Sequence, residues 1–167
     1  MPVLSIMISC PSDVKNERKI VEAVIDDINA TFGFQSGMLI RTLYWEKNVF
    51  PQAGKSPQDL VNEQVIPRAD AVIAIFGNKI GTPTEKYNSG TIEEIEIVKE
   101  AGKQVFVYFS DKKIKKNIIK SQDIRRIEKF KRKYANQGIY CNYTSNADFR
   151  ETLKNHILNL NYSRNNI

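Results

Sequence analysis

Apolar residues along this chain of 167 residues occur both in short unbroken runs and in stripes with helical spacing. An unbroken run of four to eight apolar residues suits a strand buried on both faces, whereas a helix shows apolar residues every three or four positions. Five predicted strands lie at residues 3–9, 38–45, 70–76, 104–109 and 138–143. The predicted helices lie at residues 12–33, 56–67, 90–102, 121–136 and 145–160.

Strands that alternate with helices are joined by right-handed crossovers and build a parallel sheet with helices on both faces. We therefore expect a flavodoxin-like α/β fold with five parallel strands in the order 2-1-3-4-5. No repeat or linker divides the chain, which indicates one domain over residues 1–160 and a frayed tail over residues 161–167.

Local signals mark where several of these helices begin. Ser12 is a predicted N-cap, and residues 56–59 and 145–148 are typical of capping boxes. Pro57 then occupies the first helical position, where proline is favoured. The first helix is expected to bury a stripe made of Val14, Val21, Val24, Ile25, Ile28 and Phe32.

The expected strand order predicts where a ligand would bind. Open α/β sheets bind ligands beyond the carboxyl ends of the strands, at the point where the strand order reverses. Here that point lies between the first and third strands. The segments that converge on it are residues 9–12, 45–46 and 77–91.

Two adjacent glutamates, Glu93 and Glu94, begin the helix after the third strand. At 100° per residue, Glu94 lies within the apolar arc and Glu93 on the polar one. The apolar arc also holds Ile95, Ile97, Val98 and Ala101, and the polar arc holds Glu96, Lys99 and Glu100. A carboxylate among apolar residues needs a partner or a cavity, because desolvation penalises its ionised form. Glu94 is thus the candidate reactive group, unless it only stabilises the helix N-terminus.

The net charge of +6 is concentrated in one segment. Residues 111–133 carry +8, which leaves −2 for the rest of the chain. The aromatic residues Phe130 and Tyr134 fall at helical spacing with Ile124 and Ile127, as in a core stripe. We therefore expect a solvated face or a docking surface for an acidic partner, and nucleic acid is disfavoured.

Several classes of site are disfavoured by composition. Cys10 and Cys141 fall on strands separated by two others, at about 4.8 Å per step, too far apart for a disulfide. The single His156 leaves no zinc set and no histidine-based triad. Neither a Gly-x-Gly-x-x-Gly fingerprint nor a P-loop is present. We expect no metal and no cofactor, and a cytoplasmic protein, since neither a leader nor a membrane span is recognisable.

The converging loops supply three kinds of residue that suit a small ligand. Glycines that allow close backbone approach are Gly77, Gly81 and Gly90. Hydroxyl groups come from Thr82, Thr84, Ser89 and Thr91, and aromatic rings from Trp45, Phe76 and Tyr87. One carboxylate facing such a pocket suits cleavage of a glycosidic bond, where an anion stabilises or attacks an oxocarbenium-like centre. The alternative is a flavodoxin-like domain whose loops only bind a partner.

Five segments carry a resemblance to a known family: residues 8–14, 45–51, 56–62, 76–84 and 89–94. Together they resemble the DUF4062 group of bacterial TIR-like domains over nearly the whole chain. The chain is similar in kind to TIR domains of bacterial anti-phage defence, including Thoeris sensors, which use NAD to make an ADP-ribose-derived signal or destroy it. The Gly90-Thr91-x-x-Glu94 pattern also resembles nucleoside 2-deoxyribosyltransferases, whose glutamate attacks a sugar anomeric carbon.

The resemblance implies a role for each matching residue. Glu94 would be the catalytic glutamate acting on the nicotinamide ribose of NAD, which is the substrate. The substrate-binding set would place Ser9, Cys10 and Ser12 on the nucleotide side, Trp45 and Phe76 beside a ring, and Gly77, Thr82 and Ser89 at ribose or phosphate. Thr91 also joins this set, in a position where many catalytic TIR domains have tryptophan.

The same resemblance implies partners. We expect self-assembly, a phage-derived trigger and a downstream effector that reads the product. A deoxyribosyltransferase-like enzyme and a non-enzymatic interaction module remain as alternatives.

Overall fold

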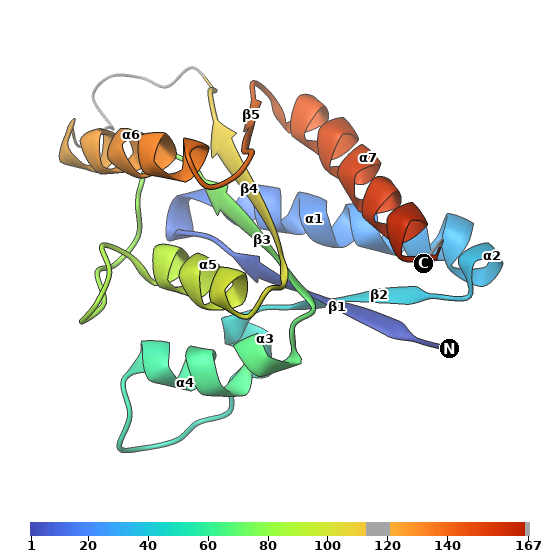
Figure 1. Ribbon diagram of the computed structural model, residues 1–167, viewed down its shortest axis with the longest axis horizontal. Helices are drawn as coiled ribbons and strands as arrows, with labels where there is room; N and C mark the ends of the chain where they lie inside the picture. The colour runs from blue at the N-terminus through green and yellow to red at the C-terminus, as the bar shows by residue number, and fades with distance from the viewer. Residues whose placement is uncertain (113–120, 166–167) are drawn as a thin grey trace.

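The computed structural model of the protein describes residues 1–112 and 121–165, and its centre is a single parallel sheet (Figure 1). The strand order is β2-β1-β3-β4-β5, so the expected flavodoxin-like order 2-1-3-4-5 is confirmed. The strands are β1 (Val3–Ser9), β2 (Leu39–Leu43), β3 (Ala71–Phe76), β4 (Gln104–Ser110) and β5 (Cys141–Tyr143).

Helices cover both faces of this sheet, as expected for a parallel sheet (Figure 1). One face is covered by α1 (Lys15–Ile28) and α7 (Asn146–Asn165), and the other by α4 (Pro57–Gln64), α5 (Gly90–Glu100) and α6 (Ser121–Ala135). Two short helices, α2 (Phe34–Ser36) and α3 (Trp45–Asn48), flank β2.

The central strand β3 is buried along its whole length. Its side chains alternate between the two faces: Ile73 and Ile75 join the core beneath α1 and α7, whereas Ala74 and Phe76 join the core beneath α5 and α6. Because both faces are covered, the strand carries no polar residue, and this explains its unbroken apolar sequence.

The first helix differs from the prediction at both ends. Ser12 is not its N-cap: residues Ser12–Val14 form a 3-10 turn that is capped by Pro11 without a side-chain hydrogen bond, and α1 begins at Lys15. After Ile28 the chain forms a π-helical turn over Asn29–Gly33. This wider turn shifts the helical phase, so Phe32 is 37% exposed and leaves the predicted apolar stripe.

The ends of other elements also differ from the prediction. β2 ends at Leu43, and Trp45 begins α3, where the Asn48 side chain accepts a hydrogen bond from the Tyr44 N–H at 2.9 Å. The predicted frayed tail is wrong as far as Asn165, because α7 continues to that residue. No helix in the described ranges is long and apolar enough to cross a membrane.

Phe149 joins α7 to the end of the sheet and should be a major source of stability. Its fully buried ring meets Tyr143 at 4.7 Å and Tyr108 at 5.3 Å between ring centroids. We expect Phe149→Ala to lower the free energy of unfolding by about 3–5 kcal/mol, because it leaves a cavity. Phe34→Ala, at a ring that is 95% exposed, should change it by no more than about 0.5 kcal/mol. Equal losses in urea unfolding of the two variants would contradict this account of the core.

Candidate functional site

Glu94 lies in a buried hydrogen-bond network between α5 and the carboxyl end of β1. Helix α5 is started by Ser89, whose Oγ accepts the Ile92 N–H at 3.2 Å. One turn later the Glu94 side chain is only 7% exposed. Ser9, the last residue of β1, donates its hydroxyl to Glu94 Oε2, and the Gln58 Nε2 group of α4 donates to Oε1 at 3.0 Å. Both carboxyl oxygens therefore have a donor.

This environment brings the titration of Glu94 into the neutral range. The pKa of its carboxyl is raised from the ordinary value of 4.5 to about 7, and burial is the largest cause of this rise. The hydrogen bonds from Gln58 and Ser9 lower the pKa and so oppose burial, and the nearby Glu93 carboxylate raises it further. A carboxyl group that titrates near pH 7 at the end of a parallel strand is typical of functional sites.

Glu93 is buried as well, contrary to its predicted place on the polar arc of α5. Its side chain is 7% exposed, and its Oε1 accepts a hydrogen bond from Asn62 Nδ2 of α4 at 2.9 Å. The other oxygen, Oε2, is buried and has no hydrogen-bond partner among the residues that the structure describes. The reason is that α4 covers this side of α5, so the helix is enclosed from two directions rather than only by the sheet.

Two of the amide side chains of α4 contact the glutamates of α5 and were not singled out from the sequence. Gln58 and Asn62 are one helical turn apart, and Gln58 Nε2 donates to Asn62 Oδ1 at 3.0 Å. Through these amides α4 contacts both glutamates of α5. Their i, i+4 spacing in the sequence indicates that the two amides lie on the same face of α4. Nothing in the sequence, however, indicated that this face lies beside α5.

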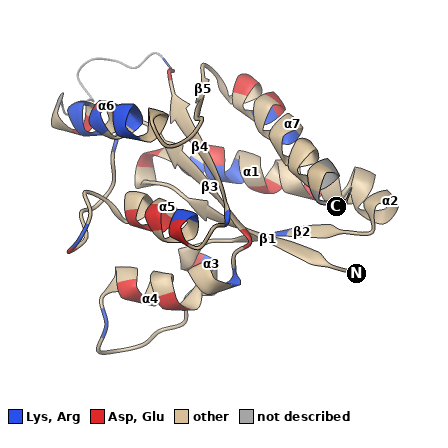
Figure 2. Ribbon diagram, in the orientation of Figure 1, with Lys and Arg blue, Asp and Glu red and all other residues tan. Residues whose placement is uncertain are grey.

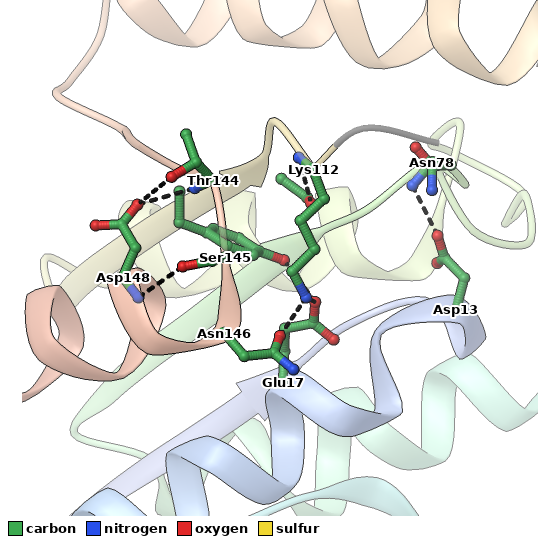
Figure 3. Close-up of polar contacts among 10 residues, drawn as sticks. Asp13, Glu17, Asn78, Lys112, Thr144, Ser145, Asn146 and Asp148 are labelled. Atoms are coloured by element: carbon green, nitrogen blue, oxygen red, sulfur yellow. Dashed lines mark hydrogen bonds and ion pairs between the residues drawn. The ribbon is translucent and has the colours of Figure 1, made fainter. Parts of the chain in front are cut away.

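The loop between β3 and α5 is pinned at several points. Asp13 Oδ2 accepts the backbone N–H group of Asn78 at 2.7 Å (Figure 3). It also accepts the backbone N–H group of Lys79 at 3.2 Å. A Cβ atom at Gly77 would lie 2.5 Å from Asp13 Oδ2, so this close approach requires glycine. At the other end of the loop, the Gly90 N–H donates to Thr82 O at 3.1 Å.

Two residues expected to contact substrate are turned away from Glu94. Cys10 follows Ser9, so its side chain points to the opposite face of the sheet and packs against the core beneath α1. Burial raises the pKa of its thiol to about 12, which keeps it protonated. The Phe76 ring is fully buried and stacks on Phe109 at 5.3 Å, so it has no face open to a ligand.

The remaining predicted residues are spread around the same end of the sheet. Ser89 is fully buried as the cap of α5, and Thr91 is buried in its first turn. Ser12 and Thr82 are exposed, and Trp45 is 54% exposed at the start of α3. Of the predicted set, Ser9 is the residue whose side chain forms a hydrogen bond with Glu94 among the described residues.

A second polar cluster lies at the ends of β4 and β5 (Figure 3). Lys112 Nζ contacts the buried Glu17 carboxylate at 2.6 Å and also Asn146 Oδ1, and the Tyr143 hydroxyl donates to Glu17 at 3.0 Å. Burial and the Glu17 charge raise the pKa of Tyr143. These contacts join α1, the end of β4, β5 and α7, which indicates a structural role that the sequence analysis missed.

The basic segment is described only in part, because residues 113–120 lie outside the described residues. In α6 the stripe of Ile127, Phe130 and Tyr134 is buried, as predicted, whereas Ile124 is 38% exposed. Lys and Arg residues are frequent along the rest of α6, as the blue positions of the ribbon show (Figure 2). The helix therefore combines a core face with a positively charged surface.

Glu94 lies in neither of two cavities found in the described part of the chain. One, of about 600 Å³, runs along β4 and α7 and includes Gln104, Ile139 and His156. The other, of about 130 Å³, lies between the ends of β3 and β4 and α6, and includes Gly77 and Lys131. Among the described residues that line it, the larger cavity is mainly apolar and has no carboxylate, whereas Asp111 and Glu128 line the smaller one. We place the candidate chemistry at Glu94 because its carboxyl group is buried and hydrogen-bonded beside the carboxyl end of β1. Within the described ranges, no group of three His, Cys, Asp or Glu residues is placed to hold a metal ion.

Comparison with known proteins identifies one family. A family model described as "Domain of unknown function (DUF4062)" matches residues 5–158. Among solved structures, the flavodiiron protein from Giardia intestinalis is similar at 11% identity, with a TM-score of 0.43. That match covers 96% of this chain and 35% of the other, so this chain spans about a third of that protein's length. No curated protein matches the chain.

The raised pKa of Glu94 makes stability depend on pH with a definite sign. The folded protein holds this proton up to about pH 7, whereas a glutamate of ordinary pKa releases it near 4.5. The free energy of unfolding contributed by Glu94 therefore falls as pH rises between these values. The variant Glu94→Gln lacks this titration. Its free energy of unfolding, relative to that of wild type, should therefore increase by roughly 1–3 kcal/mol as the pH rises from about 4.5 to 8. Urea unfolding at several pH values measures this difference, and a difference independent of pH would show that Glu94 titrates normally.

Proposed function

The chain belongs to the DUF4062 family, a domain of unknown function, and we propose that it is a TIR-like enzyme that cleaves the nicotinamide–ribose bond of NAD. The observation that carries this proposal is the Glu94 carboxylate. It is buried at the carboxyl end of β1, beside the point where the strand order reverses, and its pKa is about 7. Sheets of this kind bind nucleotides at that point.

The proposed reaction uses the negative charge of Glu94. The bond between the ribose anomeric carbon and the nicotinamide nitrogen breaks, and its electron pair goes to the nitrogen, which neutralises the pyridinium. The anomeric carbon becomes electron-deficient, and a carboxylate beside it stabilises the developing positive charge or attacks the carbon. Water or another group of the same nucleotide then adds to this carbon and releases a proton.

The hydrogen bonds at Glu94 support this assignment. Ser9 and Gln58 are neutral donors, so they orient the carboxylate without cancelling its charge as an arginine or lysine would. A buried anion surrounded by neutral dipoles stabilises a nearby cation more strongly than an anion in water does. The same dipoles leave a substantial ionised fraction at neutral pH.

The wider role that we propose follows the resemblance of the sequence to anti-phage TIR proteins. Addition of water would give free ADP-ribose, and addition of an internal group would give a cyclic nucleotide able to act as a signal. In this role the enzyme would work in the cytoplasm, respond to a phage-derived trigger, self-assemble, and supply its product to a downstream effector.

Two other functions remain as alternatives, and an assay of NAD cleavage distinguishes them from the proposed one. A nucleoside 2-deoxyribosyltransferase-like enzyme would use Glu94 on a nucleoside, exchange its base and ignore NAD. A non-enzymatic interaction module would bind partners through surfaces such as the positively charged face of α6, and its activity would be independent of Glu94 (Figure 2).

Glu94→Gln tests the proposed reaction directly. The amide keeps the shape of the side chain but carries no negative charge, so we expect NAD cleavage to fall by roughly 10³-fold or more while the fold is retained. Nicotinamide release and nucleotide products are followed by mass spectrometry, with and without lysate of phage-infected cells. Circular dichroism of the same samples reports on folding.

Glu93→Gln is the matched control on the neighbouring residue. It removes a charge of the same kind from a side chain that contacts Asn62 rather than Ser9 and Gln58, so we expect a loss of no more than about tenfold. Full NAD cleavage by folded Glu94→Gln protein would refute the mechanism. Absence of cleavage by wild type in both conditions would favour the nucleoside enzyme or the interaction module.

A further inference from the structure

Gln58 makes two hydrogen bonds that fix the orientation of its amide. Its Nε2 group donates to Glu94 Oε1 and to Asn62 Oδ1, both at 3.0 Å. If the amide were turned over, its oxygen would face these two acceptor oxygens and neither bond could form. The chemistry of the neighbours therefore requires the nitrogen to point toward Glu94.

Asn62 holds Gln58 in place from the opposite side. Its own Nδ2 group donates to Glu93 Oε1 at 2.9 Å, which leaves its oxygen free to accept from Gln58. The donors and acceptors thus form one chain that begins at Glu93 and ends at Glu94. Because each amide is fixed by the next, Gln58 has little freedom to leave the carboxylate.

Gly90 provides the space through which Gln58 reaches Glu94. A Cβ atom added at Gly90 would overlap with Gln58 Oε1, so the amide of α4 lies directly against the first turn of α5. Any larger residue at position 90 must displace this amide. Gly90 and Glu94 are four residues apart, which puts them on the same side of the helix.

We propose that Gln58 is a positioning residue for Glu94, which fixes the orientation of the carboxylate and favours its ionised form through the hydrogen bond to Oε1. The catalytic part of this inference rests on the proposed function, in which the ionised Glu94 acts on the sugar. The hydrogen-bonding part rests on the geometry alone and is tested without substrate.

The charged and titratable neighbours of Glu94 make this hydrogen bond important. Burial and the adjacent Glu93 both raise the pKa of Glu94. The Cys10 thiol at the end of β1 stays neutral, because burial raises its own pKa to about 12. The hydrogen bonds of Gln58 and Ser9 are what lower the pKa of Glu94, and that of Gln58 is the larger influence.

The test measures the pKa of Glu94 by NMR in protein with ¹³C-labelled glutamate, with Glu94→Gln used to assign the signal. Gln58→Met keeps the length of the side chain but cannot donate, so the pKa of Glu94 should rise by about one unit. Gly90→Ala should displace the Gln58 amide and so should also raise the pKa of Glu94. The double variant should show no larger shift than Gln58→Met alone, because both changes break one hydrogen bond.

Gln64→Met is the matched control on the same helix. Gln64 is also half-buried, but its amide contacts Gln52 and the Phe50 N–H rather than a glutamate. It should leave the pKa of Glu94 unchanged. An unchanged pKa of Glu94 in both Gln58→Met and Gly90→Ala would overturn the inference, and the second of these variants serves if the first does not fold.

Activity assays separate this inference from the proposed function. In the proposed function Glu94 acts in its ionised form, so kcat should rise as pH passes the pKa of Glu94. In Gln58→Met this rise of kcat should occur about one pH unit higher, and kcat should return to the wild-type value at alkaline pH. A purely structural role would lower kcat equally at all pH values and would overturn the inference. A shifted pKa of Glu94 in a protein whose wild type does not cleave NAD would support the hydrogen-bonding role and refute the proposed function.

Discussion

The structure around the carboxyl end of β1 depends on one constraint, the burial of the Glu94 carboxylate. A buried carboxylate is costly unless hydrogen-bond donors replace the water it has lost. Those donors come from separate elements, Ser9 at the end of β1 and Gln58 on α4, while α5 carries the carboxylate itself. The hydrogen bonds of Glu94 therefore join α4 and α5 to the end of β1, and the result is a group that titrates near neutral pH.

The order of the strands and the special position of Glu94 could be predicted because both follow from local patterns. β3 is apolar throughout since helices cover both faces, and Glu94 interrupts an apolar stripe. A helical wheel, however, assumes that the helix is buried on one side only. Because α5 is also covered by α4, Glu93 is buried although the wheel placed it toward water. Contacts between two helices far apart in sequence leave no periodic signal in either helix.

The surroundings of the residues expected to bind substrate were harder to predict, because a resemblance gives positions in a chain and not directions of side chains. Ser9 and Cys10 are adjacent in the sequence, but successive side chains of a strand point to opposite faces. Ser9 therefore meets α5, and Cys10 packs beneath α1. Strict use of this alternation would have separated the two residues. Phe76 shows a second difficulty. An aromatic residue at the end of a strand can pack in the core as well as contact a ligand, and the Phe76 ring packs in the core.

The contacts of the Gln58 amide explain the spacing of the Gly90-Thr91-x-x-Glu94 pattern. A glycine at the first position leaves room for the Gln58 amide, which lies against it, and the same amide reaches the glutamate one turn later. The glycine and the glutamate act as one unit with a third residue, Gln58, which lies 36 positions from Glu94 in the sequence. Loss of the glycine would disturb the carboxylate without touching it, because the amide connects them.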